Sequence, residues 1–230
     1  ERRNLFGNIS NDGSIPRDSG EHGDEMEIMK RLVIIGAGGH GKVIADIATK
    51  NGYQEIIFLD DDSSIKDCTG FEVAGTLNDC INYKKWDFIV AVGNAEIRKQ
   101  IQEKLSEYNI VTLIHPGAII SRRVSVGKGT VVMAGAVVNS DTAIGKGCII
   151  NTGATVDHDC VIGDYVHISV GTHVAGTVRI GEKTWIGAGA VVSNNVTICS
   201  DCMVGAGAAV VGDIKRSGKY VGVPARQLFN

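Results

Sequence analysis

Isoleucine or valine occupies every sixth position of this chain from Ile114 to Val210, seventeen positions in unbroken succession. Neither the 3.6-residue period of an α-helix nor a 3.5-residue heptad produces this spacing, whereas six is a multiple of the two-residue period of extended chain. The seventeen side chains therefore share one face of extended chain. A fixed short period of this kind is typical of a β-solenoid, in which each turn buries its apolar residues against the next.

The position four residues after each of these side chains is mostly small or β-branched. Three of the six cysteines stand there, namely Cys148, Cys160 and Cys202. We interpret them as packing residues, so the CxxC formed by Cys199 and Cys202 follows from the repeat and is not half of a structural zinc site, which needs four ligands. We expect all six thiols to be reduced, as in a cytoplasmic protein.

Strand and helix patterns alternate before the repeats begin. RLVIIG, EIIFLDDD and WDFIVAVGN have the short apolar runs of buried strands, whereas HGKVIADIATKNG and AEIRKQIQEKLSEYN have helical periodicity, the second with Asn94 as its N-cap. This alternation predicts a small parallel sheet of Rossmann type over residues 30–112, followed by the solenoid over residues 113–230.

Several classes of protein and partner are disfavoured by composition. Residues 1–28 are polar and aperiodic, and because the chain begins with Glu we expect a disordered tail or a linker from a longer polypeptide. A formal net charge of -3 without a Lys/Arg cluster argues against nucleic-acid binding. No apolar run approaches the roughly 20 residues of a membrane span, so no direct membrane insertion is expected.

A glycine-rich loop, GAGGHG at residues 36–41, joins the first predicted strand to the first predicted helix. Glycines let backbone N–H groups approach a diphosphate at a helix N-terminus, and Asp60 and Asp61, ending the next strand, can accept hydrogen bonds from ribose hydroxyls. NAD and a nucleotide sugar are both compatible with this pattern, and a tight turn without a ligand is the plainer alternative. His40 inside the loop, and a unit of only one mononucleotide half, weaken the case for NAD.

A histidine between two acids, Asp157–His158–Asp159, interrupts the apolar repeats directly after Val156. Neighbouring carboxylates favour the protonated imidazole, raise its basicity and hold one tautomer. Such a ring can act as general base for a nucleophile that attacks a thioester, although an ordinary surface histidine is the alternative.

Two further histidines, His167 and His173, each precede a repeat residue on successive faces of the predicted solenoid. They should point in different directions, so we expect them to hold no metal ion together within one chain. A metal ion bridging two subunits, as in hexapeptide-repeat carbonic anhydrases, is the alternative.

Two near-identical segments, IGAGAVV at residues 186–192 and VGAGAAV at residues 204–210, lie eighteen residues apart. If eighteen residues make one coil, the segments stack, and their small residues leave a shallow groove suited to the pantetheine arm of coenzyme A. Close stacking of coils alone would also favour small residues. The C-terminal KYVGVPARQLF resembles the G-x-P-A-[RK] ending of coenzyme A-dependent hexapeptide transferases, in which Arg226 could pair with a phosphate.

Together, IIGAGGHGKV, FLDDD, AVGNAEIRK, HPGAIIS, NTGATVDHDCVIGDYVHISVGTHVAGTVRIG and YVGVPAR resemble the sialic-acid O-acetyltransferase-like (NeuD/PglD-type) sugar acyltransferases with hexapeptide repeats. The resemblance covers residues 30–230 and is most similar to the N-acetyltransferases of UDP-4-amino sugars in bacillosamine synthesis. It implies a left-handed parallel β-helix, with three hexapeptides in each 18-residue coil, and a homotrimer with active sites between subunits. Acetyl-CoA would be the co-substrate, and the enzyme would transfer acetyl directly to the 4-amino group of a nucleotide-linked sugar, fused to or working beside a membrane glycosyltransferase.

The resemblance also implies a role for individual residues. His158 would be the general base, Asp159 the acid that strengthens it where related enzymes have Glu, and Gly176 a backbone N–H donor to the oxyanion. The positions expected to contact acetyl-CoA are His167, Ala188, Ala206 and Arg226. The positions expected to hold the nucleotide sugar are Gly38, Gly39, His40, Asp60, Asp61 and Gly93.

Other functions make different predictions. O-acetylation of a sialic-acid-like sugar would use the same fold and the same base. An NAD-dependent oxidoreductase would use the GAGGHG loop and bind no coenzyme A. A metal-dependent hydratase would contain stoichiometric zinc, and a non-catalytic scaffold would need neither His158 nor the groove.

Overall fold

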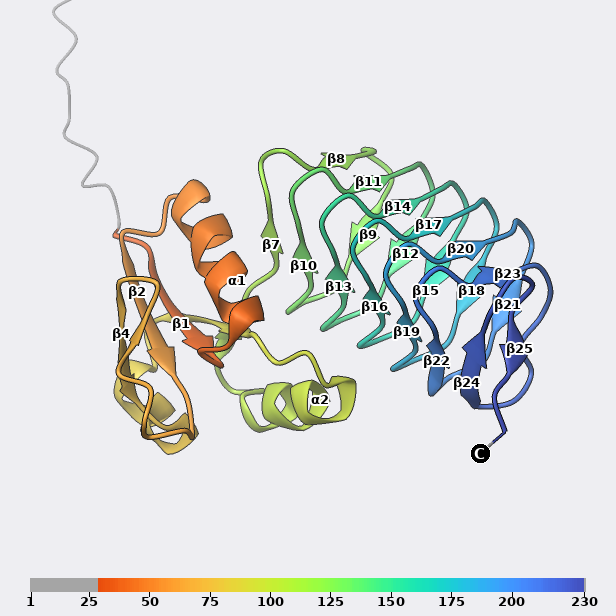
Figure 1. Ribbon diagram of the computed structural model, residues 1–230. Coiled ribbons are helices and arrows are strands. Elements are labelled where there is room, and N and C mark those ends of the chain that lie inside the picture. Colours follow the sequence, from red (N-terminus) through yellow and green to blue (C-terminus); the bar gives the residue numbers. More distant parts are fainter. Residues whose placement is uncertain (1–28, 230) are drawn as a thin grey trace, which may run out of the picture.

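The computed structural model describes residues 29–229, and the predicted disorder of residues 1–28 lies outside them. An α/β unit is followed by a long parallel β-helix (Figure 1), which confirms the predicted fold class. None of the helices within residues 29–229 has the length and apolar character that a membrane crossing requires.

The α/β unit is built on a six-stranded sheet with the order β3-β4-β2-β1-β5-β6. Strands β1, β2 and β5 are parallel and nearly continuous apolar runs, because both faces of the sheet are covered. The short antiparallel strand β3 was not predicted. The elements are β1 (Arg31–Ile35), α1 (Gly39–Lys50), β2 (Glu55–Leu59), β3 (Asp67–Cys68), β4 (Phe71–Gly75), the 3₁₀ helix η1 (Leu77–Tyr83), β5 (Asp87–Val90), α2 (Ala95–Lys104) and β6 (Asn109–Ile110).

Helix α1 lies between the sheet and the β-helix (Figure 1). Its buried residues Ile44 and Ile47 share one apolar cluster with Leu113, Val131 and Ile149, the outward residues of the first coils. The two parts of the chain therefore have a common core.

The opposite face of the sheet is covered by α2 and η1. Leu105 and Ile101 pack there with Phe88 and Val90 of β5. Helix α2 ends at Lys104, earlier than the helical pattern predicted, because Leu105 leaves the helix and packs inward before the chain enters β6.

Successive coils of the β-helix pair in parallel with a register of eighteen residues, as in Val131↔Ile149 and Val132↔Ile150. The coils form three flat faces, which confirms the predicted repeat. The first face contains β7 (Leu113–Ile114), β10 (Val131–Val132), β13 (Ile149–Ile150), β16 (His167–Ile168), β19 (Trp185–Ile186), β22 (Cys202–Val204), β24 (Gly218–Val221) and the antiparallel β25 (Arg226–Gln227). The second face contains β8 (Ile119–Ile120), β11 (Val137–Val138), β14 (Thr155–Val156), β17 (His173–Val174), β20 (Val191–Val192) and β23 (Ala209–Val210). The third face contains β9 (Ser125–Val126), β12 (Ala143–Ile144), β15 (Val161–Ile162), β18 (Arg179–Ile180) and β21 (Thr197–Ile198).

The interior of the β-helix is the predicted apolar stack. Every sixth residue from Val132 to Val210 is buried. Cys148, Cys160 and Cys202 are 0%, 0% and 2% exposed, which confirms that they are packing residues.

The corners of the coils turn through residues in the left-handed region of backbone space. Between the first and second faces these residues are all glycine: Gly135, Gly153, Gly171, Gly189 and Gly207. Between the second and third faces they are not: Asp141, Asp159, Thr177 and Asn195. Asp and Asn tolerate this conformation better than most residues, so Asp159 is compatible with a tight corner.

Candidate active site

His158 lies at the corner between β14 and β15, two residues after the buried Val156. Its ring is 57% exposed, and Nδ1 lies 2.7 Å from Oδ2 of Asp159. A carboxylate can only accept, so Nδ1 carries the proton and Nε2 keeps its lone pair. The atom free to take a proton is therefore Nε2.

The charges around His158 favour a strong base. The hydrogen bond that His158 donates to Asp159, and after it the charge of Asp157, raises the pKa of His158. Asp157 accepts from the amide of Asn139 and from the backbone N–H of His158, at 2.8 Å each, and these bonds lower its pKa. Both acids are thus arranged to stabilise a positive charge on the ring.

Gly176 occupies the same corner one coil later and makes room for the ring. A Cβ at this position would lie 2.7 Å from both Cε1 and Nε2 of His158. Within residues 29–229, the backbone N–H of Gly176 donates no hydrogen bond. The structure therefore brings His158, Asp159 and the backbone of Gly176 together.

His167 faces a groove on the first face of the β-helix, with a volume of about 410 Å³. Ala188 and Ala206 line the same groove and stack directly, since N–H of Gly207 donates to the carbonyl of Ala188 at 2.8 Å. The ring of His167 stacks on Trp185 with a centroid distance of 5.4 Å and an interplanar angle of 8°. The groove expected from the repeated small residues is present.

A wider cleft of about 680 Å³ continues from this groove toward the α/β unit. It shares His167, Trp185 and Met203 with the groove and is lined on its other side by Gly93 and the N-terminal end of α2. Asn94 caps that helix by accepting from N–H of Ile97 at 3.0 Å, as predicted. A helix N-terminus attracts negative charge, so this side of the cleft suits an anionic ligand.

The surroundings of His167 fix its protonation. Asn151 Oδ1 accepts from N–H of Thr152 at 2.8 Å, so the amide NH₂ faces His167 Nε2 at 3.2 Å. Nε2 must then accept, which leaves the proton on Nδ1. Burial, then the charges of Arg98 and His40, lower the pKa of His167 to about 3. His167 is therefore a neutral ring at physiological pH, able to donate a hydrogen bond through Nδ1.

The glycine loop places His40 against the same region. Its Nε2 is buried without a hydrogen-bond partner among the described residues, and burial followed by the charge of Arg98 lowers its pKa to about 4. Gly38 and Gly39 have open space where a Cβ would be, so a ligand can approach their backbone closely. Gly93, across the sheet edge, is equally open.

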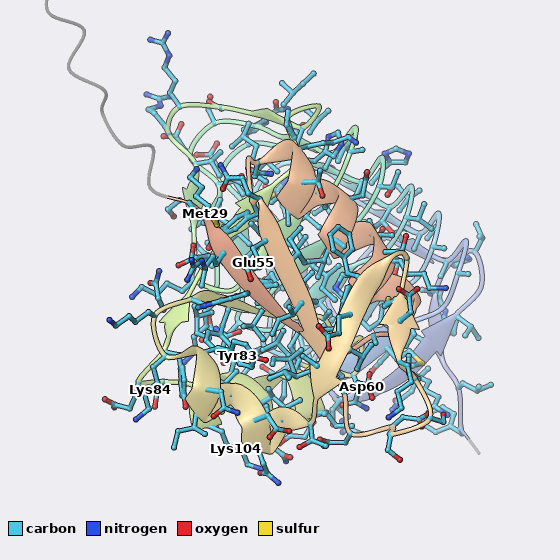
Figure 2. All side chains as sticks on the ribbon, turned by 90° about the vertical axis from the view of Figure 1, so that its left-hand side faces the viewer. Met29, Glu55, Asp60, Tyr83, Lys84 and Lys104 are labelled. Atoms are coloured by element: carbon cyan, nitrogen blue, oxygen red, sulfur yellow. The ribbon has the colours of Figure 1, made fainter. Side chains whose placement is uncertain are left out.

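Asp60 and Asp61 follow β2, at the opposite end of this strand from Glu55 (Figure 2). Asp60 accepts from N–H of Ala37 at 2.7 Å and from N–H of Asp62 at 2.9 Å. Asp61 accepts from N–H of Leu77 at 3.0 Å. Both carboxylates hold loops around a pocket of about 170 Å³, and a contact with ribose stays a prediction.

Within one chain, two of the predicted site residues, Arg226 and His158, lie apart from the groove. Arg226 is exposed on β25, where its guanidinium donates to the neighbouring carbonyl of Ala225, and it lines a separate pocket of about 300 Å³. His158 stands at the corner that joins the second and third faces, whereas His167 lies on the first face. In a three-sided prism that corner is opposite the first face, so one protomer does not bring the two histidines together.

The remaining candidate metal ligands do not converge. His167 on β16 and His173 on β17 belong to different faces. Across residues 29–229, no group of three or more His, Cys, Asp and Glu side chains is placed to hold a metal ion. Cys199 and Cys202 have their sulfur atoms 3.4 Å apart, with Cys202 buried in the core.

Two residues that line the cleft, Trp185 and Met203, were missed from the sequence, as was the buried Arg98, which donates to the carbonyl of Gly93 behind it. Trp185 and Met203 stand eighteen and thirty-six residues after His167, so the coil period itself could have identified them. Arg98 lies in a polar helix and carries no comparable signal.

Comparison with known proteins gives matches to both parts of the chain. Residues 31–105 match the family model of the PglD N-terminal domain, and residues 177–212 match that of the bacterial transferase hexapeptide (six repeats). UDP-N-acetylbacillosamine N-acetyltransferase from Bacillus subtilis (strain 168) is 38% identical over 119 residues, which are 46% of this chain and 52% of that protein. The chain thus matches about half the length of this curated relative.

Solved structures extend the similarity over nearly the whole chain. The acetyltransferase domain of PglB from Neisseria gonorrhoeae FA1090 is 44% identical with a TM-score of 0.83, covering 86% of this chain and 100% of that domain. It has also been solved with acetyl coenzyme A. PerB from Caulobacter crescentus, solved with CoA and GDP-perosamine, is 37% identical with a TM-score of 0.82, covering 86% of this chain and 97% of PerB. On these grounds the chain belongs to the PglD-type family of hexapeptide-repeat sugar acetyltransferases.

Proposed function

We propose that this protein is an acetyl-CoA-dependent N-acetyltransferase acting on the 4-amino group of a nucleotide-linked amino-deoxy sugar, with UDP as the expected nucleotide. The observation that carries the proposal is the pairing of His158 Nδ1 with Asp159, which leaves Nε2 as a base close to the backbone of Gly176. The names of the relatives and the ligands solved with them support the substrate class.

The proposed active site is completed by a second copy of the chain in a homotrimer. His158 projects from the corner opposite the face that carries His167 and the groove, so base and groove meet only if one protomer's corner faces its neighbour's groove. The open glycine loop and Gly93 would hold the nucleotide sugar beside the cleft. All six cysteines are free thiols, which supports a reducing, cytoplasmic setting.

In the proposed mechanism His158 Nε2 removes a proton as the 4-amino group attacks the thioester carbonyl. The amine must be neutral to attack, and the developing imidazolium is stabilised by Asp159. The oxygen of the carbonyl acquires negative charge and would accept from the N–H of Gly176. Collapse of this intermediate expels the thiolate of CoA.

Direct transfer in a ternary complex is favoured over an acyl-enzyme. The cysteine nearest to His158 along the chain, Cys160, is fully buried, and its thiol points toward the carbonyls of Ala175 and His158. Burial raises its pKa, so the thiolate needed for nucleophilic attack is disfavoured.

The decisive experiment is a thiol-release assay with acetyl-CoA against UDP-, dTDP-, GDP- and CMP-linked sugars, each offered with either an amino or a hydroxyl group at the accepting carbon. Release of CoA with the amino sugars alone supports the proposal. Release with hydroxyl sugars alone would assign O-acetylation instead. Nicotinamide binding without CoA release would assign an oxidoreductase.

The groove gives a first prediction about the donor. We expect Ala188→Leu to weaken acetyl-CoA binding at least about tenfold, ~1.4 kcal/mol, because the larger side chain fills the groove beside His167. Calorimetric titration of each variant with CoA measures this change. Ala188→Ser is the matched control and should bind like the wild type. Equal affinities for the leucine and serine variants would place the donor elsewhere.

The acid beside His158 gives a prediction about pH. The base must be neutral to act and its pKa is raised, so kcat/KM should increase with pH until it levels off above the pKa of His158. Asp159→Asn removes the largest cause of that shift, so the rise should move to lower pH and the plateau should be lower. The measurement is a profile of kcat/KM between about pH 5 and 9.

Asp141 provides the matched control for that profile. It occupies the equivalent corner one coil earlier, with the same left-handed backbone, and pairs with Arg123. Asp141→Asn should leave the profile in place. A profile that moves equally in both variants would mean that surface charge in general, and not the Asp159 contact, sets the pH dependence.

A further inference from the structure

A buried arginine on α2 lies between the α/β unit and the β-helix. Arg98 is 1% exposed, and its guanidinium donates four hydrogen bonds, all to backbone carbonyl oxygens. No carboxylate of residues 29–229 lies within ion-pairing distance of it. Among the described residues, the positive charge of Arg98 is thus stabilised by backbone carbonyl dipoles and by no carboxylate.

The four acceptors belong to the two parts of the chain that flank the cleft, the α/β unit and the β-helix. Arg98 donates to the carbonyls of Val92 and Gly93, at 2.8 Å each, in the loop that leads into α2. It also donates to the carbonyls of Gly147 and Tyr165, at 2.7 Å each, at equivalent corners of successive coils. Gly93 lines the cleft from the α/β side, and Tyr165 lies two residues before His167, which lines the cleft from the β-helix.

We propose that Arg98 is a positioning residue, which sets the loop at Gly93 against the face at His167 so that acceptor amine and acetyl donor meet at the correct separation. This inference rests on the proposed function. Only a planar guanidinium fork can serve four carbonyls in two directions at once. Replacing a buried ionic group with an apolar side chain of similar volume is often neutral for stability, so the role we assign to Arg98 is to fix register.

The charge of Arg98 also reaches the two neutral histidines of the cleft. After burial, it is the next cause of the lowered pKa of both His40 and His167. Arg98 therefore contributes to keeping both rings neutral, in addition to fixing the backbone on either side of them.

Lys99 offers a matched control on the same helix. Its Nζ pairs with Glu182 of the β-helix at 2.8 Å, and its side chain is 30% exposed. Lys99→Met removes a contact between α2 and the β-helix without touching the carbonyls around Gly93 and Tyr165. It therefore separates docking of the helix in general from positioning of the cleft.

The test compares Arg98→Met, Arg98→Lys and Lys99→Met in the full chain, with kcat and both KM values measured well below the unfolding midpoint of the least stable variant. We expect Arg98→Met to lower kcat at least about tenfold, because a misplacement of about 1 Å can cost 10²-fold. The affinity for CoA should be unchanged, since the groove lies within the β-helix. Arg98→Lys should not restore kcat, because an ammonium keeps the charge but lacks the fork. Lys99→Met should keep the wild-type kcat.

The outcomes separate this inference from the proposed function. If Arg98→Met lowers only the melting temperature, or if Lys99→Met loses as much turnover, the inference is wrong; if Arg98→Met does not fold, Arg98→Lys takes its place in this comparison. If the wild type acetylates no nucleotide sugar, the proposed function is wrong, and amide hydrogen exchange decides the inference. Faster exchange around residues 92–95 and 165–168 in the Arg98 variants, but not in Lys99→Met, supports it, and unchanged exchange overturns it.

Discussion

Replacing His158 with alanine is expected to lower kcat by about 10²–10⁴-fold, the usual contribution of a general base. The ring is 57% exposed and contributes nothing to the apolar core, so the variant should fold and assemble normally. The affinity for acetyl-CoA should be retained, because the groove with Ala188 and Ala206 lies on another face. Steady-state kinetics with the best acceptor, together with calorimetric titration of CoA, measure both quantities.

His115→Asn is the control for that substitution. His115 Nδ1 accepts from N–H of Gly117 at 2.8 Å, a cap that the carbonyl of asparagine can reproduce, and the residue lies outside the proposed site. It should retain wild-type turnover. A His158→Ala protein with full turnover would show that the proton is removed by another group, and the proposed mechanism would be wrong.

Gly176→Ala is expected to reduce kcat by about 10²-fold without lowering stability, because a displacement of the base by about 1 Å is enough. The new Cβ would lie 2.7 Å from Cε1 and Nε2 of His158, and the exposed ring is the group able to move. The backbone of Gly176 is not in the left-handed region, so alanine causes no strain there. Kinetics and thermal unfolding of the variant test both halves of this expectation.

Gly212→Ala is the matched control, since it also has an unstrained backbone and has open space around the added Cβ. It should be indistinguishable from the wild type in turnover. If Gly176→Ala is as active as Gly212→Ala, then His158 does not act from the position it occupies over Gly176.

The β-helix was predictable because its cause is local and periodic. A repeat residue every six positions specifies both the interior and the eighteen-residue coil, so the burial of Cys148, Cys160 and Cys202 followed from register alone. The two flanking acids, Asp157 and Asp159, likewise mark His158 in the sequence as a candidate base, a role that stays a prediction. By contrast, β3 and η1 were missed although each has a local cause: β3 forms a tight hairpin with β4 through Thr69 and Gly70, and η1 begins with a capping box of Thr76 and Asp79. Both segments are too short for hydrophobic periodicity to indicate them.

The cleft was only partly predictable, because it is formed between two units whose docking has no period. The stacked alanines indicated the groove, but Arg98 lies in a helix with an ordinary polar pattern, and its four carbonyl partners come from residues 92–165. Nor did spacing alone show that His158 and His167 lie on opposite sides of the prism. It follows from the fold, in which His158 lies at the corner between the second and third faces and His167 lies on the first face.

The regular stacking of coils also fixes the spacing of side chains along the groove. Neighbouring parallel strands are about 4.8 Å apart, so each coil advances the surface by one such step. Ala188 and Ala206 occupy equivalent positions of consecutive coils along the groove, and the exposed Val170 occupies the same position one coil earlier. The groove therefore changes in length only by whole coils. Deleting eighteen residues would shorten it by one strand spacing and keep the remaining residues on the same faces.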